Sequence, residues 1–294
     1  MSLTQHADRG AWLAARRAGI GGSDVAAILG VNRYRSALEV WAEKCGYEIP
    51  REESEAAGHG HGLEGYVLAE LAAASGVAID RLENVTRRHP SVEWAFYSPD
   101  GAAWDDCACE GVLPEAKTVG GWASLDWEDG IPAYYWPQVQ HGLWVTGLWR
   151  ALVGVLRGGP YAINFRWSWV ERDPRYVEEC VPALARFWRS VVDREPPAPD
   201  GSDSAAKAIK AMFPESIREE PIELPGALAD EAAEHDALKA EMAALDQRAR
   251  EINNRARLAL GEHARGLFAD GSGWTWTKGR KQFKRLEAKE ESSL

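Results

Sequence analysis

The chain has 294 residues, of which 45% are hydrophobic and 27% charged, so a sizeable core can form and disorder throughout is excluded. Its formal net charge of −11 argues against a protein that coats nucleic acid by bulk attraction, although a locally basic DNA groove stays compatible with it. The chain has no apolar run of membrane-spanning length, and residues 1–20 contain no apolar signal segment, so we expect a cytoplasmic protein. The cysteines include no C-x-x-C pair, which favours free thiols over a zinc or iron–sulfur site.

The N-terminal part of the sequence predicts helices followed by short strands. Residues 19–30 (GIGGSDVAAILG) indicate a glycine-rich approach, an N-cap at Ser23, a short apolar helix and a glycine stop. Further helices are predicted at about residues 36–46 and between Gly58 and Gly76. Residues 77–119 then change to short β-prone runs separated by turn residues.

The following segments complete an α/β pattern. Residues 132–147 favour a helix, strands follow at 149–156 and 161–170, and another helix extends from about 175 to 193. This order of helices and strands predicts a mixed β-sheet covered by helices.

A Pro-rich stretch divides the chain. The run EPPAPDGSD ends at residue 203 and is typical of a linker, so we expect a domain over 1–195, a linker over 196–203 and an accessory region over 204–294. The accessory region begins with a long helix, whose apolar stripe has steps of four and three residues: Leu238, Met242, Leu245, Ala249, Ile252, Ala256 and Ala259. We expect this stripe to pack on its own domain or on a neighbouring subunit. The end of the chain predicts a β-ribbon with a basic tail at 278–285.

Three charged residues in the strand-rich segment are candidates for chemistry. Asp100 lies in the turn SPDG, while Glu115 and Lys117 lie two residues apart in an apolar β-run and therefore share a face. Two carboxylates on neighbouring strands, together with a backbone carbonyl, can hold Mg²⁺ beside a phosphodiester. The lysine can orient or deprotonate the attacking water and offset negative charge. The alternative interpretation is a surface ion pair on an edge strand.

Other candidates lie on the predicted helices. Arg16 and Ser23 flank the glycine-rich approach and fit a phosphate cradle, although a plain N-cap beside a solvated arginine fits them too. Glu64 follows a Gly/His-rich run, and Gln138 lies in the helix predicted at 132–147. The run ERDPRY (171–176) links the last core strand to the last core helix.

These stretches, taken in order, resemble a known family. The set W-x-x-x-R…IGGSD, G-x-x-x-E, SPDG, E-x-K, YYWPQVQHGLWVTG and ERDPRY is similar to the lambda-exonuclease-like family, also called the YqaJ-type viral recombinase domain, of the PD-(D/E)xK nuclease superfamily. The match covers about residues 9–195. It implies an α/β fold with a restriction-endonuclease-like core, in which helices flank a central mixed β-sheet; the mainly helical C-terminal appendage lies outside the match.

The resemblance also implies an activity. A member of this family is expected to be a Mg²⁺-dependent deoxyribonuclease that acts on duplex DNA ends by two-metal hydrolysis, as a 5′→3′ exonuclease of phage-type recombination. Mn²⁺ would substitute for Mg²⁺, and no iron–sulfur cluster is expected. The expected setting is the cytoplasm of a bacterial or phage-infected cell. Expected partners are double-stranded DNA, further copies of the chain in a homo-oligomer, with a trimer favoured, and a single-strand annealing protein, but no membrane.

Carried over residue by residue, the resemblance assigns roles. Asp100, Glu115 and the Ala116 carbonyl would bind metal, with Lys117 as the catalytic lysine. The remaining assignments are Glu64 as a second acidic group near the metals, Gln138 as a contact to the active-site water or phosphate, and Arg16 with Ser23 as the 5′-phosphate pocket.

Several alternatives remain open at this stage. Asp105, Asp106 or Glu110 could replace Asp100 as ligands, and Pro114 indicates a bulge or an edge position that would disturb the strand. His59 and His61 could bind metal, although a solvated or DNA-facing loop is favoured. The function could also be that of an endonuclease of the same fold, or of a non-cleaving protein that binds DNA ends.

Overall fold

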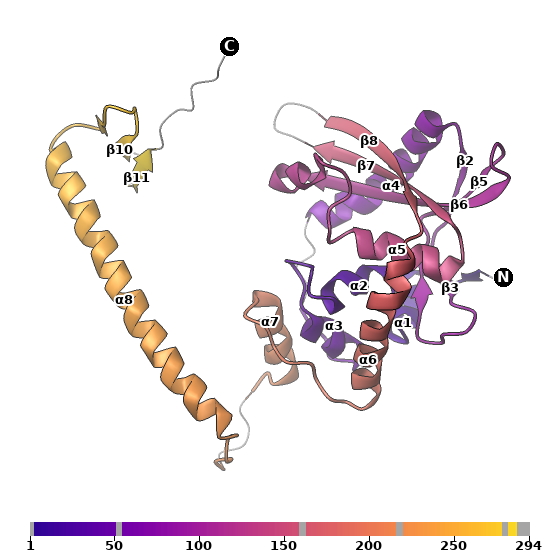
Figure 1. The fold of residues 1–294 in the computed structure, drawn as a ribbon, viewed down its shortest axis with the longest axis horizontal. Helices are drawn as coiled ribbons and strands as arrows, with labels where there is room; N and C mark the ends of the chain where they lie inside the picture. The colour runs from indigo at the N-terminus through magenta and orange to yellow at the C-terminus, as the bar shows by residue number, and fades with distance from the viewer. Residues whose placement is uncertain (1–2, 51–54, 159–162, 216–219, 278–281, 287–294) are drawn as a thin grey trace. The chain divides into compact units, whose positions relative to one another are not determined.

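A computed structural model describes residues 3–50, 55–158, 163–215, 220–277 and 282–286. The chain forms two compact units, Met1–Ser216 and Ile217–Leu294. The first unit has an α/β fold built on a central mixed sheet, drawn in magenta and pink in Figure 1.

The central sheet has the strand order β2-β5-β6-β7-β8. Its strands are β2 (Ala78–Arg81), β5 (Gly101–Asp105), β6 (Glu110–Gly120), β7 (Arg150–Gly158) and β8 (Ile163–Glu171). β6 and β7 are parallel, with Glu115 opposite Val153, whereas the other neighbours are antiparallel. A parallel pair needs a crossover connection, and this one consists of a 3₁₀ segment (Gly121–Trp127) and helix α5 (Trp136–Thr146).

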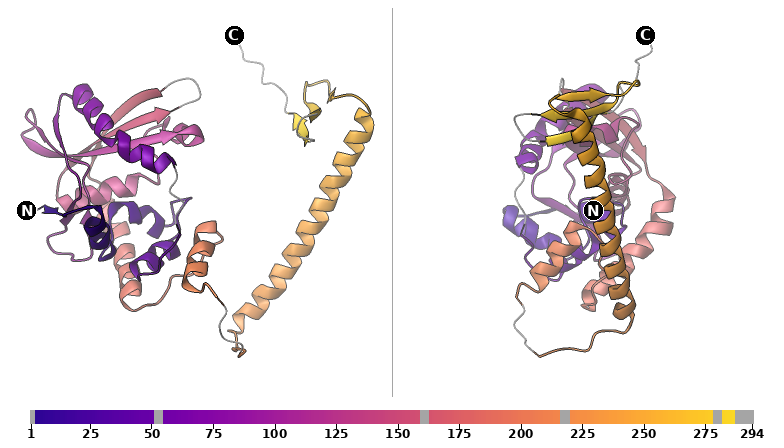
Figure 2. Two further views of the ribbon diagram at one scale, coloured as in Figure 1. Left: turned by 180° about the vertical axis from the view of Figure 1, so that it is seen from behind. Right: turned by 90° about the vertical axis from the view of Figure 1, so that its left-hand side faces the viewer.

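Helices cover both faces of the sheet (Figures 1 and 2). On one face, α4 (Glu55–Ser75) buries Leu71 against Val112 and Leu152. On the other face, the core of the unit contains Leu113 from β6 and Leu143 from α5. Because side chains alternate along a strand, Glu115 and Lys117 share the α5 face with Leu113. The sheet therefore directs the predicted acid and lysine toward α5.

The remaining elements of the unit surround this frame. The helices are α1 (Arg9–Arg17), α2 (Gly22–Ile28), α3 (Ala37–Lys44), α6 (Val181–Val192) and α7 (Asp203–Met212), and a small sheet contains β1 (Thr4–Gln5), β3 (Val85–Arg88) and β4 (Phe96–Tyr97). His141 of α5 is fully buried, with ring nitrogens 2.7 Å from the Tyr176 hydroxyl and 3.0 Å from the Phe96 carbonyl oxygen. Burial lowers its pKa to about 4, so a neutral imidazole connects β4 to α5.

Two local predictions from the sequence are wrong. Gly21 is the N-cap of α2, and Ser23 lies inside the first turn; the backbone N–H of Gly21 donates to Asp24 at 3.0 Å. Pro114 causes no bulge and is in register with Leu152 of β7, but it lies beyond the pairing with β5, so the predicted alternative of an edge position holds on that side. Its nitrogen faces the β5 side of β6, where the β5 pairing ends at Val112, so the missing N–H costs no ladder bond.

The boundary of the first unit lies later than the sequence predicts. Helix α7 follows the linker but packs on α3, with Ala205 and Ala208 buried. The Ser204 hydroxyl accepts the Ser36 N–H at 2.8 Å and donates to Glu39 at 2.5 Å. These contacts assign α7 to the first unit, which extends to Ser216 and not to residue 195.

The second unit contains a long helix and a small antiparallel sheet. α8 (Ala227–Leu260) is followed by β9 (Arg265–Leu267), β10 (Gly273–Thr277) and β11 (Gln282–Leu286), in the order β11-β10-β9. Within the described residues, no helix combines the length and apolar character that a membrane span requires. The predicted basic tail at 278–285 lies partly outside the described residues, and the side chains of β11 lie outside them entirely.

Candidate active site

Glu115 is the centre of a buried polar cluster. Its side chain is 1% exposed and accepts hydrogen bonds from the Tyr97 hydroxyl, the Lys117 ammonium and the Gln138 amide. The Gln138 Nε2 to Glu115 Oε1 distance is 2.6 Å. Three donors from β4, β6 and α5 thus compensate for the removal of this carboxylate from water.

Asp100 lies beside this cluster, immediately before β5. Its Oδ2 accepts the backbone N–H of Ala116 at 2.8 Å. Burial, together with the charge of Glu115, raises the pKa of Asp100 to about 8, against a smaller lowering effect of Lys117. The site therefore opposes ionisation of Asp100, and a nearby cation would relieve that cost.

The Ala116 carbonyl faces the same side as Asp100. The N–H and C=O of a strand residue point to one edge, and the Ala116 N–H points to Asp100. The β5–β6 register extends from the pair Asp105–Glu110 to the pair Ala103–Val112, so this edge of β6 is no longer paired with β5 at Ala116. Carboxylate and carbonyl oxygens are hard donors of the type that Mg²⁺ prefers, and this set fits such an ion. Among the residues the structure describes, however, no three His, Cys, Asp or Glu side chains converge as a metal-binding group.

Lys117 carries a positive charge in this environment. Burial lowers the pKa of its ammonium, but the charges of Glu115 and Asp100 outweigh burial and the net direction is upward. Its Nζ also lies 5.4 Å from the centre of the Tyr135 ring. The lysine is thus a hydrogen-bond donor here and not a proton acceptor.

A cavity of about 480 Å³ opens next to Asp100 and connects the candidate residues. Its lining includes Glu64, Gln138, Arg16 and Ser23. Glu64 extends from α4, and its Oε1 lies 3.7 Å from Nε of Arg81. The structure thus brings the carboxylates of Asp100 and Glu64, the Gln138 amide and the proposed phosphate ligands to one cavity, with Glu115 next to it through its hydrogen bond to Gln138.

Arg16 and Ser23 occupy the end of this cavity formed by α1 and α2. The Arg16 guanidinium donates to the Ser23 hydroxyl at 2.5 Å, and its central carbon lies 4.4 Å from the centre of the Trp12 ring. Stacking on Trp12 orients the guanidinium. Both side chains thus line the cavity with hydrogen-bonding groups that suit a phosphate.

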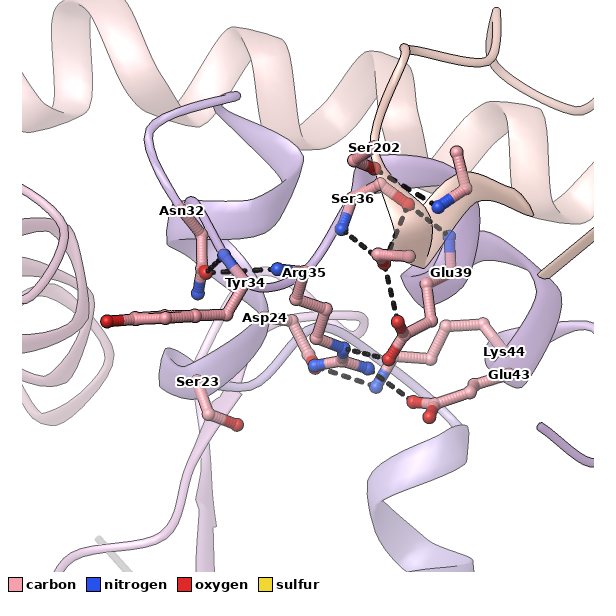
Figure 3. A network of polar contacts seen from close by, with 12 residues as sticks. Ser23, Asp24, Asn32, Tyr34, Arg35, Ser36, Glu39, Glu43, Lys44 and Ser202 are labelled. Carbon is pink, nitrogen blue, oxygen red and sulfur yellow. Dashed lines mark hydrogen bonds and ion pairs between the residues drawn. The ribbon is translucent and has the colours of Figure 1, made fainter. Parts of the chain in front are cut away.

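A buried ion-pair network supports this end of the cavity (Figure 3). Asp24, which follows Ser23, pairs with Lys44 at 2.7 Å and with Arg35 at 2.9 Å. Burial raises the pKa of Asp24, but Lys44, Arg35 and Arg16 outweigh it, so the net pKa is well below the usual range. Lys44 also donates to the Arg16 carbonyl at 2.8 Å, which ties α1 to α2 and α3.

The alternative ligands considered from sequence lie elsewhere. Arg150 pairs with Asp105 at 2.9 Å and also with Glu110, at the other end of the β5–β6 hairpin from Asp100. Asp106 lies in the turn of that hairpin and is exposed. The side chains of His59 and His61 lie outside the described residues.

Sequence reasoning missed several residues of this site. Tyr97 is fully buried and donates to Glu115, yet in the run WAFYS it is indistinguishable from a core aromatic. Burial, followed by the charges of Glu115 and Asp100, raises the pKa of Tyr97 well above its ordinary value, so it remains a donor. Arg81 and Lys44 also lacked a motif. For Tyr97, the sequence offered one indication, which was its position just before the SPDG turn. For Arg81 and Lys44 it offered no indication of a role in the site.

Comparison with known proteins assigns the chain to a family. A model of the YqaJ-like viral recombinase domain matches residues 11–149. The uncharacterized protein YqaJ of Bacillus subtilis (strain 168) is 32% identical over 267 residues, which cover 89% of this chain and 81% of YqaJ. The chain therefore belongs to the YqaJ-like viral recombinase family, as the ordered motifs predicted.

Solved structures confirm the fold. The alkaline exonuclease LHK-Exo from Laribacter hongkongensis is similar with a TM-score of 0.52 and 21% identity, over 63% of this chain and 93% of that chain. Its complex with dAMP gives a TM-score of 0.52 and 20% identity over the same shares. The mixed five-stranded sheet flanked by helices is thus an exonuclease-like architecture.

Proposed function

We propose that this protein is a Mg²⁺-dependent deoxyribonuclease that hydrolyses phosphodiester bonds at the ends of duplex DNA. The observation that carries the proposal is the buried cluster of Asp100, Glu115 and Lys117 beside a cavity that also contains phosphate-binding groups. The exonuclease architecture of LHK-Exo, and the viral recombinase domain of the family, agree with this function. Mn²⁺ would substitute for Mg²⁺ because it accepts the same oxygen ligands.

Asp100, Glu115 and the Ala116 carbonyl would hold the metal, with Glu64 as a further acidic group on the same cavity. Mg²⁺, in the two-metal arrangement that the family resemblance implies, supplies positive charge beside the scissile phosphate. Tyr97 and Gln138 orient the Glu115 carboxylate by hydrogen bonds from β4 and α5. The metal-binding face of Glu115 is thereby fixed before substrate enters.

Lys117 acts on the phosphate and the attacking water as a charged donor. Its ammonium remains protonated in the metal-free site, so it orients the water and offsets the negative charge that develops on the phosphate oxygens. Gln138 lies between the cavity and Glu115, where its amide can also contact the water or phosphate.

We also propose that Arg16 and Ser23 bind the 5′-phosphate at a DNA end. A guanidinium and a hydroxyl within hydrogen-bond distance of each other can bind the oxygens of one phosphate. A terminal phosphate held there gives cleavage from the 5′ end, which is the 5′→3′ direction. We propose a homo-oligomer, a trimer, as the working form, with a single-strand annealing protein as a candidate partner in recombination.

The test is digestion of linear duplex DNA, with 5′-phosphate or 5′-hydroxyl ends, against closed circular DNA in Mg²⁺. We expect linear DNA to be degraded, circular DNA to be spared, and chelation to stop the reaction. Lys117→Ala should lower the rate by about 10²–10³-fold, the scale for loss of one transition-state stabiliser. Lys207→Ala, an exposed lysine of α7, is the matched control. Cleavage of circular DNA would assign an endonuclease, and binding of ends without cleavage would assign an end-binding protein.

The same assay tests the end pocket. Arg16→Ala should reduce the preference for 5′-phosphate over 5′-hydroxyl ends, whereas the neighbouring exposed Arg17→Ala should keep it. An equal loss on both substrates would make Arg16 a structural residue.

A further inference from the structure

The long helix α8 presents one continuous apolar stripe to solvent. Most of its large apolar side chains lie at two positions of a seven-residue repeat, with Leu238 51% exposed, Met242 62% and Leu245 63%, whereas Leu258 near the end of the helix lies outside the repeat. The first position (a) holds Leu228, His235, Met242, Ala249 and Ala256; the second (d) holds Glu231, Leu238, Leu245, Ile252 and Ala259. This repeat is the pattern of a two-stranded coiled coil, in which each stripe residue packs into the facing helix.

We propose that α8 pairs with α8 of a second copy of this chain as an antiparallel coiled coil. In the register we propose, Met242 packs opposite the partner's Leu245, and the two-fold axis passes between residues 243 and 244. The helix contains 34 residues, or about 51 Å at 1.5 Å per residue, which is enough for several repeats.

The side-chain sizes along the stripe fit this register. In antiparallel pairing each a residue faces a d residue, so Ala249 faces the partner's Leu238 and Leu228 faces the partner's Ala259. A large residue meets a small one in these layers, and alternation of this kind fills the space between helices evenly. A parallel pair would instead place Ala249 opposite Ala249, which leaves a gap, whereas large residues meet in the Met242 layers of either orientation.

The charges that flank the stripe are the stronger argument. On one flank, antiparallel pairing in this register sets Glu241 against the partner's Arg248 and Glu234 against the partner's Arg255. On the other flank, it sets Lys239 against the partner's Asp246. Two-fold symmetry repeats each of these contacts. Every charged pair that flanks the stripe in this register is therefore of opposite sign, which specifies both partner and orientation.

A parallel pair in register lacks this complementarity. There, Glu234 would meet the partner's Lys239, but Glu241 would meet the partner's Asp246, a repulsive contact. Arg248 would meet the partner's Asn253 and find no charge. The signs of the flanking charges thus favour antiparallel over parallel pairing.

Ion pairs within the helix compete only weakly with these contacts. Arg248 lies 2.9 Å from Glu251, and Arg250 lies 3.4 Å from Asp246, all on the exposed surface. Exposed pairs of this type contribute little, and a carboxylate can accept from two guanidinium groups. Both kinds of contact can therefore exist together.

The experiment is light scattering on the full chain over a concentration series. Glu241→Arg places like charges opposite each other at two symmetric contacts and should halve the particle mass. Arg248→Glu should do the same. The double variant exchanges the two charges, which restores opposite signs across the interface, and should recover the parental mass. Asp236→Arg makes a similar charge change on the far side of the helix and should leave the mass unchanged.

Each outcome decides the proposal. The proposal is supported if both single variants halve the particle mass and the double variant recovers it. Glu241 and Arg248 are seven residues apart and do not contact each other within one helix, so the recovery would require a contact between two helices. A mass that is the same in all variants overturns the proposal, as does a double variant that stays at half mass. An increase in the stability of the assembly on Glu241→Arg assigns parallel pairing and also overturns it. The mass ratio of two applies when α8 joins two separate particles, either two single chains or the two rings proposed for the first unit.

Discussion

Asp100 lies in an environment that disfavours its charged form in the metal-free protein. Its carboxyl is buried beside Glu115, and its pKa is raised from the ordinary 3.8 to about 8 by burial and by the charge of that neighbour. An acid with a raised pKa in the folded state stabilises the fold at low pH, and that contribution is lost as the pH rises through the folded pKa. Above pH 8 the native chain therefore carries an opposed pair of buried charges unless a cation binds.

Asp100→Asn should stabilise the metal-free chain at pH 9 by about 1–3 kcal/mol, the scale of an uncompensated buried group, and much less at pH 5. The amide keeps an acceptor for the Ala116 N–H but carries no charge. Chemical unfolding in a chelator at the two pH values measures the difference. Asp105→Asn is the control, because Asp105 has a lowered pKa and should lose stability at both. A gain that does not depend on pH would contradict the assignment. The same variant should be inactive.

At the scale of single residues, the sequence predicted which candidate side chains lie together better than it predicted the residues that surround them. Asp100, Glu115, Lys117 and Gln138 follow from a turn motif, a two-residue spacing in a strand and a family pattern, and the structure brings all four together. Tyr97 could not be predicted, because a buried tyrosine in an apolar strand has the same sequence signature whether or not its hydroxyl has a partner. Ser23 was placed correctly in the cavity but wrongly as an N-cap, since Asp24 satisfies the Gly21 N–H.

At the scale of elements, helix α7 extends the first unit beyond its apparent end. The Pro-rich stretch predicted a domain boundary, because composition cannot indicate whether the segment after a linker returns to the core. Ala205 and Ala208 are small enough to lie directly on α3, and Ser204 bonds across the contact. A mixed sheet covered by helices was predictable from the order of strand and helix periods, whereas the strand order and the return of α7 depended on tertiary contacts.

We expect the two possible ends of the first unit to differ in stability. A chain that ends at Ser216 should unfold with the stability of the first unit in the full chain. One that ends at Asp200 should lose about 2–4 kcal/mol, because two buried alanines and two hydrogen bonds contribute about 1 kcal/mol each. Urea unfolding of both chains measures this. Equal stabilities would show that α7 adds nothing to the fold, and Ser204→Ala in the full chain checks the hydrogen-bond share.

At the scale of the whole molecule, the net charge of −11 disfavours prolonged binding to DNA, which is also negatively charged. Bulk attraction to phosphates is weak for such a chain, so a closed ring would help by holding the duplex topologically. The fold and the family motifs were predictable because they depend on local pattern. The arrangement of subunits was not, since the surfaces that would form a ring carry no periodic signal.

We expect the first unit to form the ring by itself. A chain that ends at Ser216 should have the mass of three chains in light scattering, and the full chain twice that number through α8. The reason is that closed cyclic assemblies need only one repeated interface, and the motifs of the family lie within this unit. A truncated chain with the mass of one would exclude the ring.

One contact in the first unit bears on the size of the product. Gly22 lies between Tyr97 and Gln138, and a Cβ there would lie 2.6 Å from Tyr97 Cε2 and 3.2 Å from Gln138 Cγ. Ser23, the next residue, lines the same cavity as Tyr97 and Gln138, the two side chains that orient Glu115. If Arg16 and Ser23 hold the 5′-phosphate, as we propose, the span from that phosphate to the reacting bond would act as a fixed ruler, and its length would set how many nucleotides leave at each step. Gly22→Ala should lengthen the ruler, and chromatography of the digest should then detect longer fragments; an unchanged fragment length would mean that the count is set elsewhere.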